Sequence, residues 1–491
     1  MTGAARSDEQ LGAAAIAAAV GSGRLRAVEV HAAAWRRHEA THASLTALVQ
    51  PRFAESAGEA AAVDDRPGGP LAGVPVSVKE CFPVRGLRTP LGIRARAALV
   101  DASDAVLVTR LREAGAVIVA KANVPQAMYL HETDNPVFGR TSHPLAGDRG
   151  PGGSSGGDAA AVAAGVVPLA VGNDLAGSLR QPAHACGIAA IVPRSEVLGE
   201  GGAIDTLPGL RAVRPRAGFL AGSVADLALA CRAVNAASAH AGGVRRVGWW
   251  DSAGPITASA AIRRGVAEAV GRLRAAGVDT IALDGGLAET AAWLHLAILS
   301  AGGATDIRRL LAGERPMRHV GRLLRLAGMP RWLRPPVAGL ARLAGRRIEA
   351  EGLMATGPRD AAGLAELLAS RSGLLGRLAA ATRGCDAVVC PVSALPALRH
   401  GTAARLVLAA APCFLANLLD LAAGAVPVTM VRPDEEAGRP ASRDPVLRAA
   451  AATDRGSRGL PVGVQVIAPP GGDEATVLEV MRLIEGPSPP G

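Results

Sequence analysis

The sequence predicts an α/β protein, in which a mixed or parallel β-sheet is covered by helices. Helical and strand-like segments alternate within residues 103–126, where the helix SDAVLVTRLREAGA precedes the apolar strand VIVAKANVP. Further short apolar segments occur at 245–250, 278–283, 385–392, 424–431 and 460–467. Such alternation favours a sheet covered by helices. Of the 491 residues, 49% are hydrophobic, so the chain can bury a large core.

The other elements follow from local patterns along the chain. Residues 8–60 are expected to be helical, and residues 70–81 form a turn and a short strand that carries Lys79. A long loop at 127–150 holds the only tyrosine, Tyr129. Helices are expected at 223–237, 257–276 and 473–485, a mostly helical region at 290–380, and a loop at 432–458. We expect one domain, 1–491, divided into N-terminal helices (1–60), a catalytic core (61–245), a helical insertion (290–400) and a return to the sheet (401–486).

Composition excludes several classes of protein. The formal charge of +10 would suit an anionic partner. The basic residues are spread along the chain, however, and no repeated pattern of basic and aromatic residues marks a nucleic-acid surface, so we expect no nucleic-acid binding. The six cysteines form no CxxC pair, and the N-terminus has no signal-peptide pattern. With no apolar stretch long enough to span a membrane, we expect a cytoplasmic protein.

The histidines do not provide a complete metal site. Only His38 and His42 have the HExxH spacing, the other eight histidines are scattered, and a catalytic zinc site needs three protein ligands. We therefore expect no metal and no cofactor. His131 and His184 lie near the motifs described next, and both are predicted to be hydrogen-bonded structural residues.

Lysine usage singles out two positions. The chain has 53 basic residues, and only Lys79 and Lys121 are lysine. Arginine stays protonated, whereas a buried lysine can lose its proton and act as a base. A lysine retained in an arginine-rich chain is thus a candidate base, although chance retention is the alternative.

The stretch from Pro151 to Arg180 is the centre of the predicted site. It begins with GGSSGG and ends with NDLAGS, and an Ala/Val run between them predicts a buried helix and a short strand. A flexible linker would not contain that run. The small-residue turn before Ser178 can direct several backbone N–H groups at one negative charge, as an oxyanion hole requires.

These motifs resemble the amidase signature family. Lys79 lies in PVSVKE, Ser154 in GGSSGG and Ser178 in NDLAGSLRQPAHACGI. Similar stretches at 115–128, 221–230 and 459–475 extend the resemblance over most of the chain. The segments at 123–144 and 329–347 are most similar to the fatty-acid amide hydrolase branch. The resemblance implies one large mixed sheet covered on both faces by helices.

The resemblance also implies a Ser–Ser–Lys triad. Ser178 would be the nucleophile, Ser154 would relay the proton from a cis peptide, and Lys79 would be the base. A serine hydroxyl needs such a base, and lysine can serve only if burial lowers its pKa. The remaining implied residues are the oxyanion-hole N–H groups of Leu175, Ala176, Gly177 and Ser178, the loop-bracing Asp174, Arg180 and Ser155, and the substrate-lining Met128 and Tyr129.

Three departures from the family pattern leave the triad complete. Glu80 stands where the family has Asp after the lysine, and Ala176 stands where it has Gly. Residues 190–194 replace the usual Gly-Leu-Lys-Pro-Thr. Ala176 is tolerable only with a negative φ. Together these changes favour a specialised or weakened activity.

We interpret the chain as a cofactor-independent serine amidase that acts on a small-molecule amide, hydrophobic or lipid. Three different functions would also fit the motifs: an acyl transferase of a specialised pathway, a glutaminase-type amidase subunit, and a non-catalytic binding protein on the same fold. A homodimer is left open.

Residues 305–350 form a candidate cap. From Arg308 to Arg347 there are eleven arginines and one acid, Glu314, interleaved with leucines and Trp332. One interpretation is an ordinary amphipathic surface helix. The second is a peripheral membrane contact, in which arginines meet anionic headgroups and apolar residues enter the acyl region.

Overall fold

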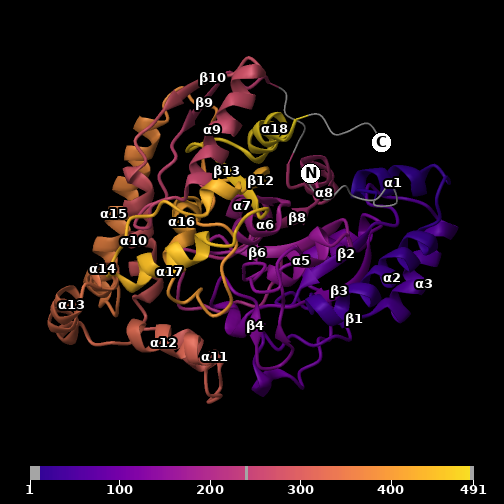
Figure 1. Ribbon diagram of the computed structural model, residues 1–491. Helices are drawn as coiled ribbons and strands as arrows, with labels where there is room; N and C mark the ends of the chain where they lie inside the picture. The colour runs from indigo at the N-terminus through magenta and orange to yellow at the C-terminus, as the bar shows by residue number, and fades with distance from the viewer. Residues whose placement is uncertain (1–10, 238–241, 487–491) are drawn as a thin grey trace.

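The structure is a computed structural model that describes residues 11–237 and 242–486 (Figure 1). Its strands are β1 Leu48–Pro51, β2 Pro75–Lys79, β3 Val117–Ala122, β4 Asp134–Asn135, β5 Gly139–Arg140, β6 Leu169–Asp174, β7 Ala189–Val192, β8 Arg216–Ala221, β9 Arg246–Trp249, β10 Asp279–Ala282, β11 Ala387–Pro391, β12 Ala423–Met430 and β13 Pro461–Ile467.

The helices of the described residues are α1 Ala13–Gly21, α2 Ala27–Leu45, α3 Phe53–Asp65, α4 Val106–Glu113, α5 Gly156–Ala163, α6 Arg180–Cys186, α7 Ser195–Leu198, α8 Val224–Ala233, α9 Ala260–Ala275, α10 Gly286–Ser300, α11 Thr305–Leu310, α12 Arg318–Ala327, α13 Arg334–Leu343, α14 Arg347–Ala355, α15 Ala361–Ala381, α16 Ala411–Leu419, α17 Pro445–Asp454 and α18 Glu474–Glu485. The 3-10 turns are η1 Arg94–Arg96, η2 Gln126–Met128, η3 Arg331–Leu333, η4 Val407–Ala410 and η5 Pro433–Glu435.

One mixed sheet of 11 strands runs through the molecule in the order β1-β3-β2-β6-β8-β7-β12-β13-β11-β9-β10. The pairs β3–β2, β2–β6, β11–β9 and β9–β10 are parallel, and the other neighbours are antiparallel. The strands β2, β3, β6 and β13 are buried along their whole length, as their nearly continuous apolar sequences predict. The predicted mixed α/β class is confirmed.

Helices cover both faces of the sheet. A Cβ added to Gly424 in β12 would contact Met481 of α18, whereas one added to Gly463 in β13 would contact His184 of α6. Gly463 pairs with Pro427, three residues along β12 from Gly424. Because side chains alternate between faces, α18 and α6 lie on opposite sides. Helices α8 and α9 pack beside α18, and α5 packs beside α6.

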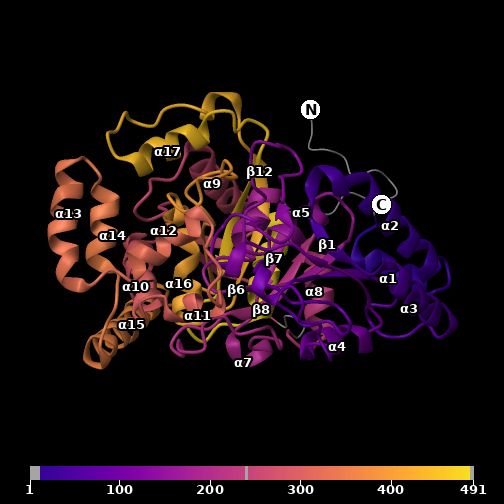
Figure 2. The same ribbon diagram turned by 90° about the horizontal axis from the view of Figure 1, so that it is seen from below.

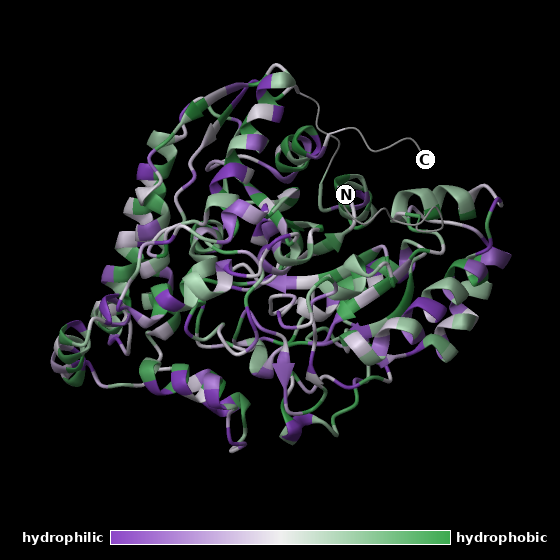
Figure 3. Cartoon of the chain, in the orientation of Figure 1, coloured by the Kyte–Doolittle hydropathy of each residue, from purple (hydrophilic) through white to green (hydrophobic). Residues whose placement is uncertain are grey.

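Apolar periodicity explains why the covering helices bind the sheet. In α9 the buried residues Ile262, Val266, Ala269 and Leu273 recur at helical spacing and form one stripe. The peripheral helices alternate polar and apolar residues in the same way, as Figure 3 shows for α9 and α12. The side chain of Asp473 accepts a hydrogen bond from Thr476 N–H and caps α18.

Helices α10 to α15 lie within residues 286–381, and strand β11 follows them inside the range 290–400 that was predicted to be a helical insertion. Helices α13 and α14 pack together at the outer edge of the molecule (Figure 2). They share a small apolar cluster of Ala338, Ala350 and Leu353. Over residues 11–237 and 242–486, no helix is both long and apolar enough to cross a bilayer.

Three local predictions were wrong. Strand β1 interrupts the region predicted to be helical at 8–60, of which residues 8–10 lie outside the described part of the chain. The predicted loops at 127–150 and 432–458 contain the β4–β5 hairpin and helix α17. Asp444 caps α17 through Val446 N–H, and Pro445 occupies its first turn, so local capping signals marked this helix.

Candidate active site

The parallel strands β2 and β6 bring Lys79 to the carboxyl end of its neighbour. Val78 pairs with Val171, so the last residue of β2 lies beside the end of β6. The Lys79 Nζ donates to the backbone oxygen of Asn173 at 3.2 Å and to its Oδ1 at 2.6 Å. Lys79 is fully buried. Two segments 94 residues apart in sequence thereby build one polar centre.

Ser154 completes the surroundings of this amino group. Lys79 Nζ lies 2.8 Å from Ser154 Oγ, and the Gly153–Ser154 peptide is cis. A Cβ on Gly153 would lie 2.6 Å from the carbonyl oxygen of Leu130 and 2.8 Å from Glu132 N. Glycine is therefore required at 153 because another backbone approaches closely. The loop GGSSGG is packed against the core, as its sequence context predicts.

Ser178 lies in the turn between β6 and α6. Gly177 has φ +92°, and a Cβ there would lie 2.8 Å from Cys413 Cβ. Ala176 does not have a positive φ, so the condition for an alanine at this position is met. The carbonyl oxygen of Ser178 accepts from Ser155 N–H at 3.2 Å, which ties the two serine loops together. Ser178 retains 8% exposure, against 2% for Ser154.

Asp174 and Arg180 brace the turn through a buried ion pair. Arg180 Nη2 lies 3.0 Å from Asp174 Oδ1, and both side chains have no solvent exposure. Burial alone would raise the pKa of Asp174, but Arg180 and backbone hydrogen bonds hold that pKa well below its usual range. Arg180 also donates to Asn417 Oδ1 at 2.5 Å and to Gln465 Oε1 at 2.9 Å. The turn is thus anchored to helix α16 and strand β13.

The backbone N–H groups of the turn differ in their partners. Gly177 N–H donates to Asp174 Oδ1 at 2.6 Å. Within the described residues, the N–H groups of Leu175, Ala176 and Ser178 have no protein acceptor. Of the four N–H groups predicted as oxyanion donors, the Gly177 N–H therefore already has a partner in Asp174.

Burial controls the protonation of the centre. Desolvation lowers the pKa of Lys79, and nearby acidic groups only partly oppose it. Desolvation also raises the pKa of Asp158, to about 7, although Ser77 Oγ donates to its carboxylate at 2.7 Å. Burial therefore makes the Lys79 amine easier to deprotonate beside Ser154.

Glu80 has a clear structural partner. Its carboxylate accepts from Leu91 N–H at 2.8 Å and from Gly92 N–H at 3.1 Å, where φ is +55° and +63°. Successive N–H groups in such turns form an anion-binding nest. Burial raises the pKa of Glu80 to about 7, opposed in part by Lys121. Glu80 therefore holds the neighbouring loop at Leu91 and Gly92.

Met128 ends the turn η2, and Tyr129 follows it. Both are half-buried and pack against the main core. The chain continues to Leu130, which contacts Gly153, and to His131, whose Nε2 lies 2.8 Å from the Ala176 carbonyl oxygen. The two predicted substrate-lining residues therefore lie close in sequence to a segment that contacts both serine loops.

His131 and His184, the two histidines near the serine motifs, form hydrogen bonds with the backbone. His131 contacts the Ala176 carbonyl, and His184 is bonded to the backbone of Leu395 and Gly463. Desolvation lowers the pKa of each. They hold loops around the site.

The sequence reasoning overlooked several residues of the centre. Asn173 opens the NDLAGS motif, and its polar side chain near the end of an apolar strand was the available signal. Gln181, whose Oε1 accepts from Gly153 N–H at 3.1 Å, is adjacent to Arg180. Asn417 and Gln465 lie more than 200 residues from Arg180 in sequence, so no local pattern indicated that they would contact it.

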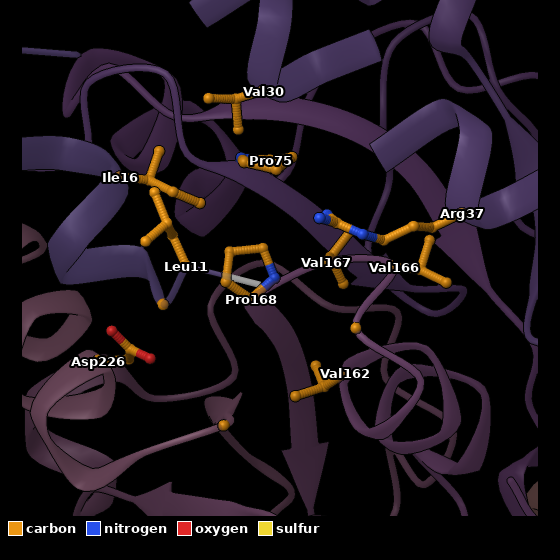
Figure 4. A pocket seen from close by; sticks show the side chains of 13 residues that line it. Leu11, Ile16, Val30, Arg37, Pro75, Val162, Val166, Val167, Pro168 and Asp226 are labelled. Carbon is orange, nitrogen blue, oxygen red and sulfur yellow. The ribbon is translucent and has the colours of Figure 1, made fainter. Parts of the chain in front are cut away.

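A separate small cavity lies at the opposite end of β2. It measures about 30 Å³, and its lining includes Leu11, Ile16, Pro75 and Val166. Figure 4 shows these apolar side chains around it, with Asp226 at one side. Pro75 begins the strand that Lys79 ends, and four residues of strand span roughly 13 Å. The cavity therefore does not belong to the lysine–serine centre.

Comparison with known proteins identifies the family of this site. Residues 29–477 match the family model described as Amidase. The chain belongs to the amidase family. The enzyme is accordingly a hydrolase that acts on amide C–N bonds. The match includes Lys79, Ser154 and Ser178, so the whole centre described above lies inside it.

Two curated relatives extend the match over most of the enzyme. It is 32% identical over 449 residues to fatty-acid amide hydrolase 1 of Sus scrofa, covering 86% of this chain and 77% of the relative. It is 30% identical over 478 residues to fatty acid amide hydrolase 1 of Caenorhabditis elegans, covering 91% and 82%. A solved fatty acid amide hydrolase has the same fold, with a TM-score of 0.84, 21% identity and coverage of 97% and 85%.

Proposed function

We propose that the enzyme hydrolyses a hydrophobic carboxamide through an acyl-enzyme on Ser178, with Ser154 as proton relay and Lys79 as base. The observation that carries this proposal is the contact of the buried Lys79 Nζ with Ser154 Oγ at 2.8 Å, beside two oxygens of Asn173. A neutral amine has two N–H groups and one lone pair. If the N–H groups donate to the two Asn173 oxygens, the lone pair is directed at the hydroxyl of Ser154.

The first chemical step then follows from this arrangement. Ser154 passes its hydroxyl proton to Lys79 Nζ and takes the proton of Ser178, whose Oγ attacks the amide carbon. The carbonyl electron pair moves to oxygen, and the oxyanion accepts hydrogen bonds from the free N–H groups of the turn. Donors fixed in advance stabilise this charge without reorganisation.

The second step breaks the C–N bond. The proton on Lys79 returns through Ser154 to the leaving nitrogen, and the amine departs from a Ser178 ester. Water then attacks the ester carbon, giving up its proton by the same relay. The carboxylic acid is released, and Ser178 regains its hydroxyl proton.

The proposed substrate class is a lipid or other long-chain amide. The curated relatives are named fatty-acid amide hydrolases. The side chains of Met128 and Tyr129 would meet the acyl chain. On the cap, Trp332, Leu340 and Leu343 are 74%, 68% and 88% exposed. These apolar residues, with the neighbouring arginines, support a peripheral contact with an anionic membrane.

Two arginines of the cap make contacts within the cap itself. Arg334 is buried and donates to the carbonyl oxygens of Met329 and Leu353 at 2.9 and 3.0 Å. Arg322 pairs with Glu349 at 2.9 Å. Fewer of the eleven arginines are therefore available to an anionic surface, because these two hold the cap together.

The test is intact-mass analysis after treatment with a fluorophosphonate, followed by turnover of lipid, aryl and amino-acid amides. We expect one phosphonyl adduct on wild type and none on Ser178→Ala. Ser155→Ala is the matched control and should still be labelled. A wild-type chain that is neither labelled nor active on any amide would refute the proposal and favour a binding protein.

Product analysis separates hydrolysis from acyl transfer and from glutaminase activity. Reactions run with and without an added primary amine distinguish hydrolysis from acyl transfer, because a transferase would join the acyl group to the added amine. Glutaminase activity that appears only with partner subunits would instead favour an amidase subunit.

A further inference from the structure

Two side chains outside the proposed mechanism attach the turn η2 to the cap. Gln126 is fully buried at the start of this turn. Its Nε2 donates to Glu314 Oε1 at 3.2 Å, and its Oε1 accepts from Met317 N–H at 2.8 Å. The second oxygen of Glu314 accepts from Ala95 N–H at 3.0 Å. Three hydrogen bonds thus join η2, the turn η1 and the segment between α11 and α12.

Glu314 lies in a segment of the chain that is otherwise rich in arginine. It is the only acid between Arg308 and Arg347, among eleven arginines. Within the described residues its carboxylate forms no ion pair with any of them and accepts from an amide side chain and a backbone N–H. The acid of the cap therefore serves attachment to the core.

The backbone of η2 needs such support. Ala127 and Met128 have φ of +57° and +54°, which residues with a Cβ rarely adopt. Conformations of this kind persist where the surroundings fix them. Ala127 N–H donates to the Leu91 carbonyl at 2.8 Å. The loop held by Glu80 thus fixes one side of the turn, and Gln126 fixes the other to the cap.

We propose that Gln126 and Glu314 are positioning residues that hold Met128 and Tyr129 against the cap and thereby set a preference for long acyl chains. This inference rests on the proposed function. The amide reacts at Ser178, and only a long chain would extend from there past η2 toward the cap. Loss of the clamp should therefore affect long substrates and spare short ones.

Chemistry allows the clamp to be broken and rebuilt. In Gln126→Glu, a second carboxylate would face Glu314 and lose the donated hydrogen bond. In Glu314→Gln, the amide can satisfy either Gln126 or Ala95 N–H, but not both. The double variant Gln126→Glu/Glu314→Gln can restore all three bonds, because residue 314 then donates to the carboxylate at 126 while accepting from Ala95.

The experiment measures kcat and KM of the full chain on propionyl and oleoyl anilides. We expect each single variant to raise KM for the oleoyl substrate about tenfold, with kcat on the propionyl substrate changed less than twofold. The double variant should return to within threefold of wild type. Glu349→Gln is the control, since Glu349 pairs with Arg322 and Arg346 inside the cap. It should leave both substrates unchanged.

The opposite results are equally specific. Equal losses on both substrates, no loss on either, or no rescue by the double variant would overturn the positioning role. Wild type that accepts propionyl but not oleoyl anilide would also overturn it while leaving the amidase proposal intact. Wild type that is unlabelled by fluorophosphonate and inactive on both would overturn the proposed function itself.

Discussion

The serine loops and the cap differ in which side chains they bury and which they leave exposed. Lys79, Asp174 and Arg180 have no solvent exposure, and each makes several hydrogen bonds inside the protein. In the cap, Trp332 and Leu343 are 74% and 88% exposed. The first region is determined by its internal contacts, which suits chemistry that needs fixed donors. The second leaves apolar surface available to a partner outside the chain.

The largest effect should come from the nucleophile. Ser178→Ala should lower kcat by about 10⁶-fold, because members of a triad act as a unit. Its unfolding transition should stay near that of wild type, since one buried hydroxyl is removed. Steady-state assay with a chromogenic amide measures the loss. Wild-type turnover in this variant would move the nucleophile elsewhere.

The two buried lysines allow a matched test of the base. Lys79→Arg should lower kcat/KM by about 10²–10⁴-fold, because arginine keeps its proton. In wild type, kcat/KM should rise with pH through the depressed pKa of Lys79, since the neutral amine is the active form. A pH–rate profile from about pH 5 to about pH 10 measures both.

Lys121→Arg is the control for burial without chemistry. Lys121 Nζ donates to the Arg88 carbonyl at 2.7 Å and to Thr89 Oγ1 at 2.5 Å, away from the serines. This variant should lose stability yet keep the wild-type pH profile in its folded fraction. A flat profile in wild type, or a shifted one in the Lys121 variant, would contradict the assignment of the base.

The Asp174–Arg180 ion pair, which braces the turn between β6 and α6, should contribute to the free energy of unfolding. Asp174→Asn leaves Arg180 buried without its charge partner and should cost about 3–5 kcal/mol of unfolding free energy. Because the pKa of folded Asp174 is depressed, the stabilisation is full above the unfolded pKa and is lost as pH falls through the folded value. Urea unfolding at pH 7 measures the cost of the variant, and a series on wild type from about pH 5 to about pH 2 measures the loss, because the pKa of an unfolded Asp is about 3.9.

An ion pair in the cap should contribute much less to the free energy of unfolding than the buried Asp174–Arg180 pair. Glu349→Gln breaks the partly exposed pair with Arg322 and should cost about 1 kcal/mol or less. Similar losses for this variant and for Asp174→Asn would remove the distinction between the two regions.

The smallest effect on the folded protein should come from exposed cap residues. Trp332→Ala/Leu343→Ala should leave unfolding and short-amide turnover unchanged. It should weaken co-sedimentation with anionic vesicles about tenfold or more, because each large apolar side chain contributes about 1.5–3 kcal/mol when fully buried. No vesicle binding by wild type at low or high salt would refute the membrane contact.

Local patterns predicted many elements because helix and strand periodicity is set by neighbours in sequence. Strands β2, β3 and β13 were expected from their nearly continuous apolar residues. The region from α6 to β8 was not divided into elements, since its helices and strands are only four to seven residues long. The order of the 11 strands also depends on pairing between distant segments, which no local window contains.

By itself, the sequence determined the small-residue turns around Ser154 and Ser178 and the choice of lysine at 79 in an arginine-rich chain. These features are local, because glycine and lysine differ from other residues in their own backbone freedom and proton affinity. Only the tertiary structure decided that Asn173 holds the Lys79 amino group, that Asp174 takes the Gly177 N–H, and that Gln126 meets Glu314. Hydrogen bonds such as the last join atoms 188 residues apart in sequence, and folding alone brings such atoms within reach.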